Sequence, residues 1–160
     1  MKNKLSIIFT PFLFFNELIE RSISEQGLAL DDSLKFYLAS LLSENMDPDK
    51  LLKKSEEHPY AGMPLAIIFR QSLLEQTEKR RKMLKYVGDY SLYVGGYFSE
   101  SLKKGLVSHS YYISIGEDAF SGLSAISRQK NLSILYNDIV DNFIQMLLIL
   151  KGVSHLTKKT

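Results

Sequence analysis

The sequence predicts an all-α fold: a single-domain bundle of about six to seven helices spanning residues 1–160. Three observations lead to this prediction. Apolar side chains return at every third or fourth position along most of the chain, which is the period of one helical face. No stretch alternates apolar and polar residues for long enough to indicate a half-buried strand. All four prolines lie in the first 64 residues, which leaves the second half free of the strongest helix breaker.

The N-terminal apolar run, Leu5–Phe15, is expected to lead into a first helix rather than to act as a signal peptide, because no small-x-small cleavage site follows it. Thr10-Pro11 is typical of an N-cap with proline at the first helical position. Gly27 is typical of a left-handed stop, so the first helix is predicted over residues 11–26. Without a leader peptide, the protein is expected in the cytoplasm.

Two further helices are expected before a central loop. Asp31 or Asp32 is predicted to cap the second helix. The aspartate-proline pair at residues 47–48 predicts a short, mostly charged third helix that ends near Glu57. Residues 58–64 contain two prolines and a glycine, which is the clearest loop signal in the chain. The loop should divide helical pairs rather than domains, because the part before it is too short for a core of its own.

The helical pattern resumes at Pro64 and continues to Val87, and in weaker form to Phe98. Such a length is unusual for one helix of a small domain. A break or kink is therefore predicted, either near Gly88 or inside the very polar segment 75–82.

The C-terminal part is predicted to form two helices. One starts near Ser108 or Ser110, and the last starts at about Asn131 and has the most regular apolar period of the chain. This last helix is apolar on nearly all sides over residues 143–150. Such a helix is either central in the bundle or contacts another subunit, and we favour central burial over a homodimer. Residues 156–160 are expected to form a short flexible tail.

Several classes of protein are not expected from this composition. The absence of cysteine excludes disulfides, thiolate nucleophiles and cysteine-ligated metals. The net charge of +2 is too small for a dedicated nucleic-acid binder. No apolar block reaches the roughly 20 residues that span a bilayer, so no membrane span is predicted. The three histidines have no metal-ligand spacing, and no catalytic or nucleotide-binding motif is present, so neither a cofactor nor a metal is expected.

Four tyrosines are the main functional candidates. They recur at spacings of four, three and four, so in a helix they share one face: Tyr86, Tyr90, Tyr93 and Tyr97. Tyrosine combines apolar area with a polar tip, which suits the wall of a ligand pocket or a docking surface. The alternative, which we favour, is a half-buried core face whose hydroxyls reach the rim. The glycines among these tyrosines indicate either close helix contact or a bend.

Asp89 lies in the middle of this aromatic segment, where a buried carboxylate needs a partner. It is predicted to cap a restarted helix or to pair with Lys85, Arg80 or Arg81. The alternative is a catalytic base with a raised pKa, which we consider less favoured.

The basic run at residues 79–82 includes Arg80 and Arg81 and is the densest in the chain. It is expected to be a solvated face in which Glu78 pairs with Lys82. Binding of phosphate or of an acidic partner is the alternative.

Three segments together resemble a family of small bacterial helical proteins to which no activity is attached. They are Gly88-Asp89-x-x-Leu92-Tyr93-x-x-Gly96-Tyr97-Phe98, then Tyr111-Tyr112-x-x-x-Gly116-x-x-Ala119-Phe120, and then residues 143–154. The resemblance extends from about Thr10 to Ser154 and implies a bacterial, helical, cytoplasmic protein. Gly95 and Phe120 stand where the family pattern has serine and tyrosine, which implies that those hydroxyls are dispensable.

Two hypotheses about function follow. The first is a non-catalytic binding or regulatory module that recognises a protein partner through the tyrosine face, or a second copy of itself through residues 143–150. The second is a small-molecule sensor or enzyme with a pocket lined by Asp89, Tyr93, Tyr112 and Glu117.

Overall fold

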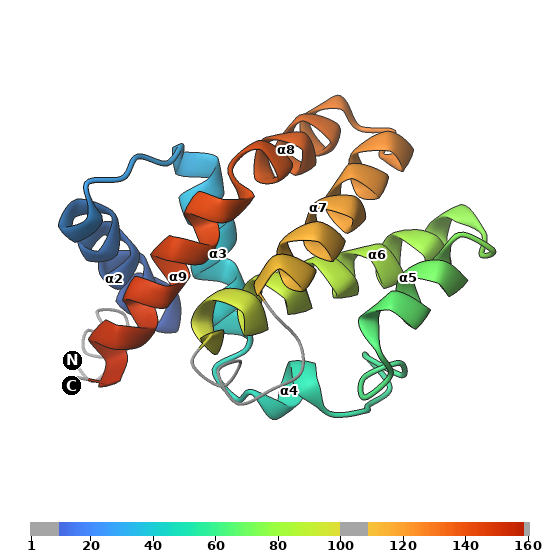
Figure 1. The fold of residues 1–160 in the computed structure, drawn as a ribbon, viewed down its shortest axis with the longest axis horizontal. Helices are drawn as coiled ribbons and strands as arrows, with labels where there is room; N and C mark the ends of the chain where they lie inside the picture. Colours follow the sequence, from blue (N-terminus) through green and yellow to red (C-terminus); the bar gives the residue numbers. More distant parts are fainter. Residues whose placement is uncertain (1–9, 100–108, 159–160) are drawn as a thin grey trace, which may run out of the picture.

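The computed structural model describes residues 10–99 and 109–158, and every regular element within them is helical (Figure 1). The all-α prediction is therefore confirmed. The described part contains eight α-helices and one π-helix: α2 (Pro11–Gln26), α3 (Asp32–Glu44), α4 (Asp49–Leu52), α5 (Leu65–Ser72), α6 (Thr77–Leu92), η1 (Tyr93–Tyr97), α7 (His109–Ile126), α8 (Lys130–Asp141) and α9 (Phe143–Lys158). Both long helical patterns of the second half are divided, which is why there are more helices than expected.

Capping residues set the limits of α2 as predicted. Thr10 Oγ1 accepts a hydrogen bond from the backbone amide of Leu13 at 3.1 Å, and Gly27 closes the helix with a φ of 64°. Asp31 occupies the N-cap position of α3, although its side chain makes no capping hydrogen bond. The part of the predicted N-terminal run that precedes residue 10 lies outside the described residues. α2 packs against α3 and also against α9, which joins the two ends of the described chain.

The third helix is shorter than predicted. Asp47 caps it by accepting a hydrogen bond from the Asp49 amide at 3.0 Å, but α4 ends at Leu52 instead of near Glu57. It ends there because Lys53 is extended, with φ −104° and ψ 147°. Residues 58–64 form turns, so the predicted loop is confirmed.

The break predicted after Pro64 occurs at residues 73–76, where the polar segment begins. Arg80 stabilises this turn. Its guanidinium donates hydrogen bonds to the carbonyls of Ser72 at 3.0 Å, Leu73 at 3.0 Å and Glu75 at 3.1 Å, which lie at the end of α5 and in the turn after it. Arg80 therefore has a structural role in joining α5 to α6.

The alternative break near Gly88 was wrong, because α6 continues through Gly88 to Leu92. A Cβ atom at Gly88 would lie 2.7 Å from the ring of Phe120, so this glycine serves close contact rather than a bend. The irregularity comes later, where the Phe98 amide donates to the Tyr93 carbonyl at 3.0 Å. This hydrogen bond to the fifth preceding residue widens the turn into the π-helix η1.

The prediction of a single last helix from Asn131 was also wrong. The chain turns by 74° between α8 and α9 at Asn142. The Asn142 side-chain amide donates to the Asp138 carbonyl at 2.8 Å, and its backbone adopts φ −116° and ψ 17°. Side-chain hydrogen bonding of this kind competes with regular helix. The turn lets α8 pack on α7 while α9 packs on α2 and η1.

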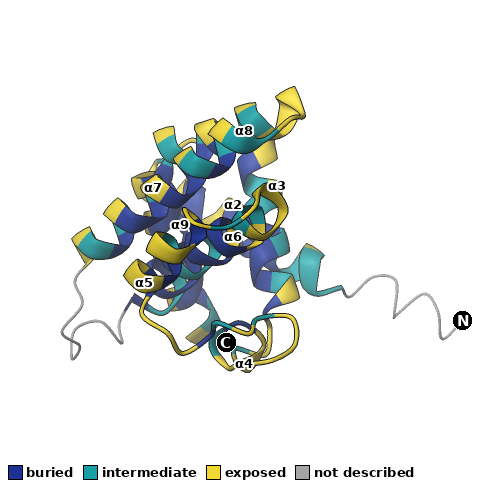
Figure 2. Cartoon of the chain, turned by 90° about the vertical axis from the view of Figure 1, so that its right-hand side faces the viewer, coloured by how far each residue is buried: buried dark blue, intermediate teal, exposed yellow. Residues whose placement is uncertain are grey.

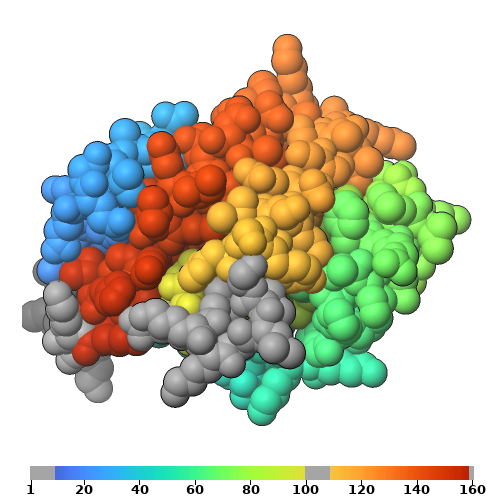
Figure 3. Space-filling model, in the orientation of Figure 1, coloured from blue at the N-terminus to red at the C-terminus, as the bar shows by residue number. Residues whose placement is uncertain are grey.

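α9 is central in the bundle on one face and reaches the surface on the other. Figure 3 shows it exposed between α2 and α7. Ile144 and Leu148 are 55% and 42% exposed, whereas Met146, Ile149 and Leu150 are fully buried. The helix continues to Lys158 with Leu156 buried, so the expected tail at residues 156–160 is helical as far as it is described.

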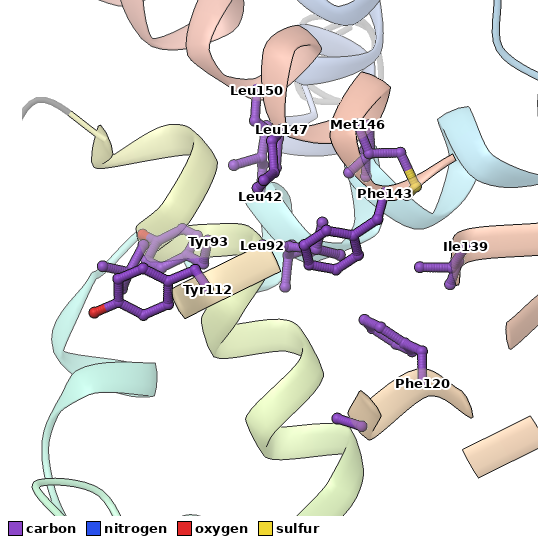
Figure 4. Close-up of a cluster of buried hydrophobic side chains, with 14 of the residues drawn as sticks. Leu42, Leu92, Tyr93, Tyr112, Phe120, Ile139, Phe143, Met146, Leu147 and Leu150 are labelled. Carbon is purple, nitrogen blue, oxygen red and sulfur yellow. The ribbon is translucent and has the colours of Figure 1, made fainter. Parts of the chain in front are cut away.

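The core forms where α6, η1, α7 and α9 meet, and Figure 4 shows their side chains converging there. Figure 2 shows the same division, with buried residues along the inner helices and exposed residues at the loops. The helices approach each other closely at glycines. A Cβ at Gly96 would lie 2.8 Å from the Cβ of Leu150, and one at Gly116 would overlap the ring of Phe143.

Within the described residues, no single helix has the length and apolar character needed to span a membrane. Only α8 and α9 taken together reach that threshold, and they are separated by the 74° turn.

Gly96→Leu should destabilise the protein by about 1–3 kcal/mol, because the new side chain would overlap Leu150 in a packed core. Urea unfolding followed by circular dichroism measures this. Ser121→Leu, at an exposed position of α7, is the control and should change stability by less than about 0.5 kcal/mol. Equal stability of the two variants would show that the helices do not meet closely at Gly96.

Candidate functional site

The tyrosine face of α6 and η1 points largely into the protein. Tyr86 and Tyr93 are 3% and 1% exposed. The Tyr86 hydroxyl donates to the Leu51 carbonyl at 2.9 Å, and the Tyr93 hydroxyl donates to the Asn45 carbonyl at 2.7 Å. Burial raises the pKa of both hydroxyls well above the ordinary value, so they remain donors at neutral pH. These two tyrosines attach α6 and η1 to the chain around α4.

The remaining aromatic candidates are also in contact with the core. Tyr90 is half-buried and stacks on Tyr112, with ring centroids 6.5 Å apart. Burial, with Tyr90 and Tyr111 nearby, raises the pKa of Tyr112 to about 12. Tyr97 is half-buried, and its hydroxyl donates to Thr157 Oγ1 of α9 at 3.4 Å. These rings therefore pack between helices rather than forming an exposed ridge.

Glu117 is half-buried on α7, and its carboxylate makes no hydrogen bond or ion pair with another described residue. The pocket predicted from Asp89, Tyr93, Tyr112 and Glu117 is not assembled as a unit. Asp89 and Tyr93 line different cavities.

Most of the basic run is neutralised locally. Lys79 pairs with Glu75 at 3.2 Å, and Arg80 is committed to the α5–α6 turn. Arg81 pairs with Glu78, so the predicted pair between Glu78 and Lys82 does not form. The Lys82 side chain has neither an ion pair nor a hydrogen bond with any described residue.

Asp89 is the centre of a half-buried polar cluster that joins α3 to α6. Tyr37 of α3 donates its hydroxyl to Asp89 Oδ1 at 2.5 Å, and Lys85 Nζ donates to Oδ2 at 2.7 Å. The Lys85 ammonium also lies 5.3 Å from the centroid of the Tyr37 ring. The Asp89 side chain is only 14% exposed, and these two donors compensate for its loss of water. Pairing with Lys85 was among the predicted roles of Asp89.

The pKa values of Tyr37 and Lys85 are both raised, so both side chains stay protonated at neutral pH. Burial and the negative charge of Asp89 raise the pKa of Tyr37 well above its ordinary value. Burial lowers the pKa of Lys85, but the charge and hydrogen bond of Asp89 outweigh this effect and raise it overall. Tyr37 and Lys85 therefore both act as donors to Asp89 at neutral pH.

Two cavities meet at this cluster. The larger one, which we call the charged cleft, has a volume of about 610 Å³ and lies between the end of α3, α4, the segment after α4 and α6. The smaller one, the side cavity, has a volume of about 210 Å³ and is lined mainly by α3 with Leu135 of α8. Glu44, Lys85 and Asp89 line both, so these three residues form a shared wall.

The charged cleft contains equal numbers of both signs of charge. Four lysines and four acidic residues line it: Lys50, Lys79, Lys82, Lys85, Glu44, Glu56, Glu57 and Asp89. Three aromatic rings, those of Tyr86, His58 and Tyr60, also line it. The centroid of the Tyr86 ring lies 5.0 Å from that of His58 and 5.8 Å from that of Tyr60.

Sequence reasoning found some of these residues and missed others. Asp89 and Tyr86 were candidates, and they do line the same cleft. Tyr37 was missed because its spacing marks it only as part of the inner face of α3. Glu44 and Glu57 were missed because isolated acidic residues on a helix end or a loop carry no signal for a site.

Among the described residues, no group of three or more histidine, aspartate or glutamate side chains is arranged to hold a metal ion. No family model matches the chain, and neither a curated protein nor a solved structure matches it. The family resemblance of the segments around Gly88 and Gly116 therefore stays a prediction. The case for a function has to be made from the geometry of the charged cleft.

Tyr37→Phe should destabilise the protein by about 1.5–3 kcal/mol, because it removes one of the two donors to the nearly buried Asp89 carboxylate. Urea unfolding measures the loss. Tyr60→Phe is the matched control, since the Tyr60 hydroxyl makes no hydrogen bond with any described residue, and it should change stability by less than about 0.5 kcal/mol. A Tyr37→Phe protein as stable as the control would contradict a stabilising role for this cluster.

Proposed function

We propose that this protein is a binding domain whose ligand, a small charged molecule, occupies the charged cleft. The observation that carries the proposal is the shared wall of Glu44, Lys85 and Asp89, where two cavities meet at a carboxylate fixed from both sides. A rigid charged group at the meeting point of two cavities is suited to orienting a ligand.

The dimensions and lining of the cleft support this proposal. A volume of about 610 Å³ is within the range of small-molecule sites, which is roughly 300–1,000 Å³. Such sites combine apolar or aromatic walls with a few fixed polar groups. In the charged cleft, the rings of Tyr86, Tyr60 and His58 form the aromatic part of the wall. The lysines and acidic residues are the polar groups.

The geometry favours binding over catalysis. Both Asp89 oxygens already accept hydrogen bonds, one from Tyr37 and one from Lys85. A general base must instead reach the proton that it removes from a substrate. Recognition of a protein partner through the tyrosine face has less support, because the buried Tyr86 and Tyr93 have their hydroxyls bonded inside the protein.

The proposal can be tested by titrating isotope-labelled protein with benzoate and, separately, with benzylammonium. Amide shifts in the NMR spectrum should concentrate on residues that line the charged cleft. Lys82→Glu should weaken benzoate binding about fivefold, in the range of a partly exposed charge pair, and Lys151→Glu on α9 should leave it unchanged. The proposal would be contradicted if neither probe shifted the amide signals of the cleft residues. It would also be contradicted if Lys82→Glu and Lys151→Glu changed the benzoate affinity equally.

A second proposal, self-association through residues 143–150, is supported by the exposed Ile144 and Leu148 on α9. Neighbouring exposed apolar side chains on one helix are a typical feature of an interface.

Ile144→Lys combined with Leu148→Lys should convert a dimer to a monomer, because two charges would have to be buried in the interface. Sedimentation velocity at high protein concentration measures this, with Gln145→Lys, at an exposed polar position of α9, as the control. A wild-type protein that sediments as a monomer throughout would rule this interface out.

A further inference from the structure

The charges that line the charged cleft come from several parts of the chain: Glu44 of α3, Lys50 of α4, Glu56 and Glu57 after α4, and Lys79, Lys82, Lys85 and Asp89 of α6. Lys79, Lys82 and Lys85 follow one another at intervals of three along α6, so they lie along one side of that helix. Glu56 and Glu57 belong to the segment between α4 and α5, which Figure 1 shows beside α4. On α6 the charge without an ion pair to a described residue is Lys82, and on this segment such charges are Glu56 and Glu57.

These opposite charges do not neutralise each other across the cleft. Lys79 and Lys85 each pair with an acidic residue four positions away along the chain, Glu75 in the turn before α6 and Asp89 in α6. No ion pair within 4.0 Å joins Lys82 to Glu56 or Glu57, or to any other described residue, although they line the same cavity. Charges of both signs are therefore left available, with room between them for a ligand.

A ligand with a single charge gains from one side of such a cleft and is opposed by the other. A ligand with a cationic end and an anionic end gains from both, because its charges complement the separated charges of the protein. The half-buried rings of Tyr60 and His58, which pack on the buried Tyr86 ring, give its middle part an aromatic surface to pack against.

We propose that the charged cleft binds a zwitterionic small molecule of the size of a short peptide, with its carboxylate towards Lys82 and its ammonium towards Glu56 and Glu57. The inference rests on the function proposed above and adds the class of ligand. It requires no movement of the helices, because the charges already line one cavity.

The test compares four forms of one probe, the tripeptide glycyl-phenylalanyl-glycine: with free ends, N-acetylated, C-amidated and blocked at both ends. Binding to the full-length protein is measured by NMR titration. The free tripeptide should bind most tightly, and each blocked end should weaken binding about fivefold, as expected for a partly exposed charge pair.

Two variants assign each end of the probe to one side of the cleft. Lys82→Gln should weaken the free and N-acetylated forms, which keep the carboxylate, and leave the amidated form unchanged. Glu56→Gln combined with Glu57→Gln should weaken the free and amidated forms and leave the acetylated form unchanged. These side chains are exposed and have no ion pair with a described residue, so both variants should fold, and circular dichroism checks this.

If all four forms bind in the cleft with equal affinity, the proposal of a zwitterionic ligand is wrong, but the proposed binding function is not contradicted. The same conclusion follows if no tripeptide binds but benzoate or benzylammonium does. If neither the tripeptides nor these two ions bind in the cleft, both proposals fail together.

Discussion

The structure depends on glycines at the positions where α6 and η1 meet α7 and α9, because a larger side chain there would overlap the neighbouring helix. A Cβ at Gly88 would lie 2.7 Å from the Phe120 ring, and one at Gly96 would lie 2.8 Å from the Leu150 Cβ. A Cβ at Gly116 would overlap the Phe143 ring. Each glycine costs about 1 kcal/mol of helix propensity relative to alanine, which the packing of large side chains over the backbone must offset. The same contacts determine how deeply α6 lies in the bundle.

The depth of α6 in turn creates the charged cleft. One side of this helix is buried, and its Tyr86 hydroxyl, like that of Tyr93 in η1, attaches the chain around α4 through main-chain carbonyls. Another side carries Lys82, Lys85 and Asp89 to the edge of the cleft. A helix has 3.6 residues per turn, so one segment supplies both the core and a wall of the binding site. The attachment also places Glu56 and Glu57, which follow α4, in the same cavity.

The local signals of the sequence were accurate where they concerned single turns of chain. The Thr10 cap, the Gly27 stop and the loop at residues 58–64 were all found from residue type alone, because capping and turn chemistry act over a few residues. The break at Asn142 was missed. The apolar period continues through it, and the residue type alone does not reveal that the Asn142 side chain bonds back to the Asp138 carbonyl.

The sequence by itself determined the helical class, where several helices begin and the presence of a carboxylate at Asp89 that needs a partner, because each of these follows from local periodicity and residue chemistry. Only the tertiary structure decided that Tyr37, 52 positions away, is the second partner of Asp89 beside the predicted Lys85, and that the tyrosine face turns inward. It also decided that Lys82 and Glu57 share a cavity. These relations depend on how helices distant in sequence pack, and no pattern within a single helix records that.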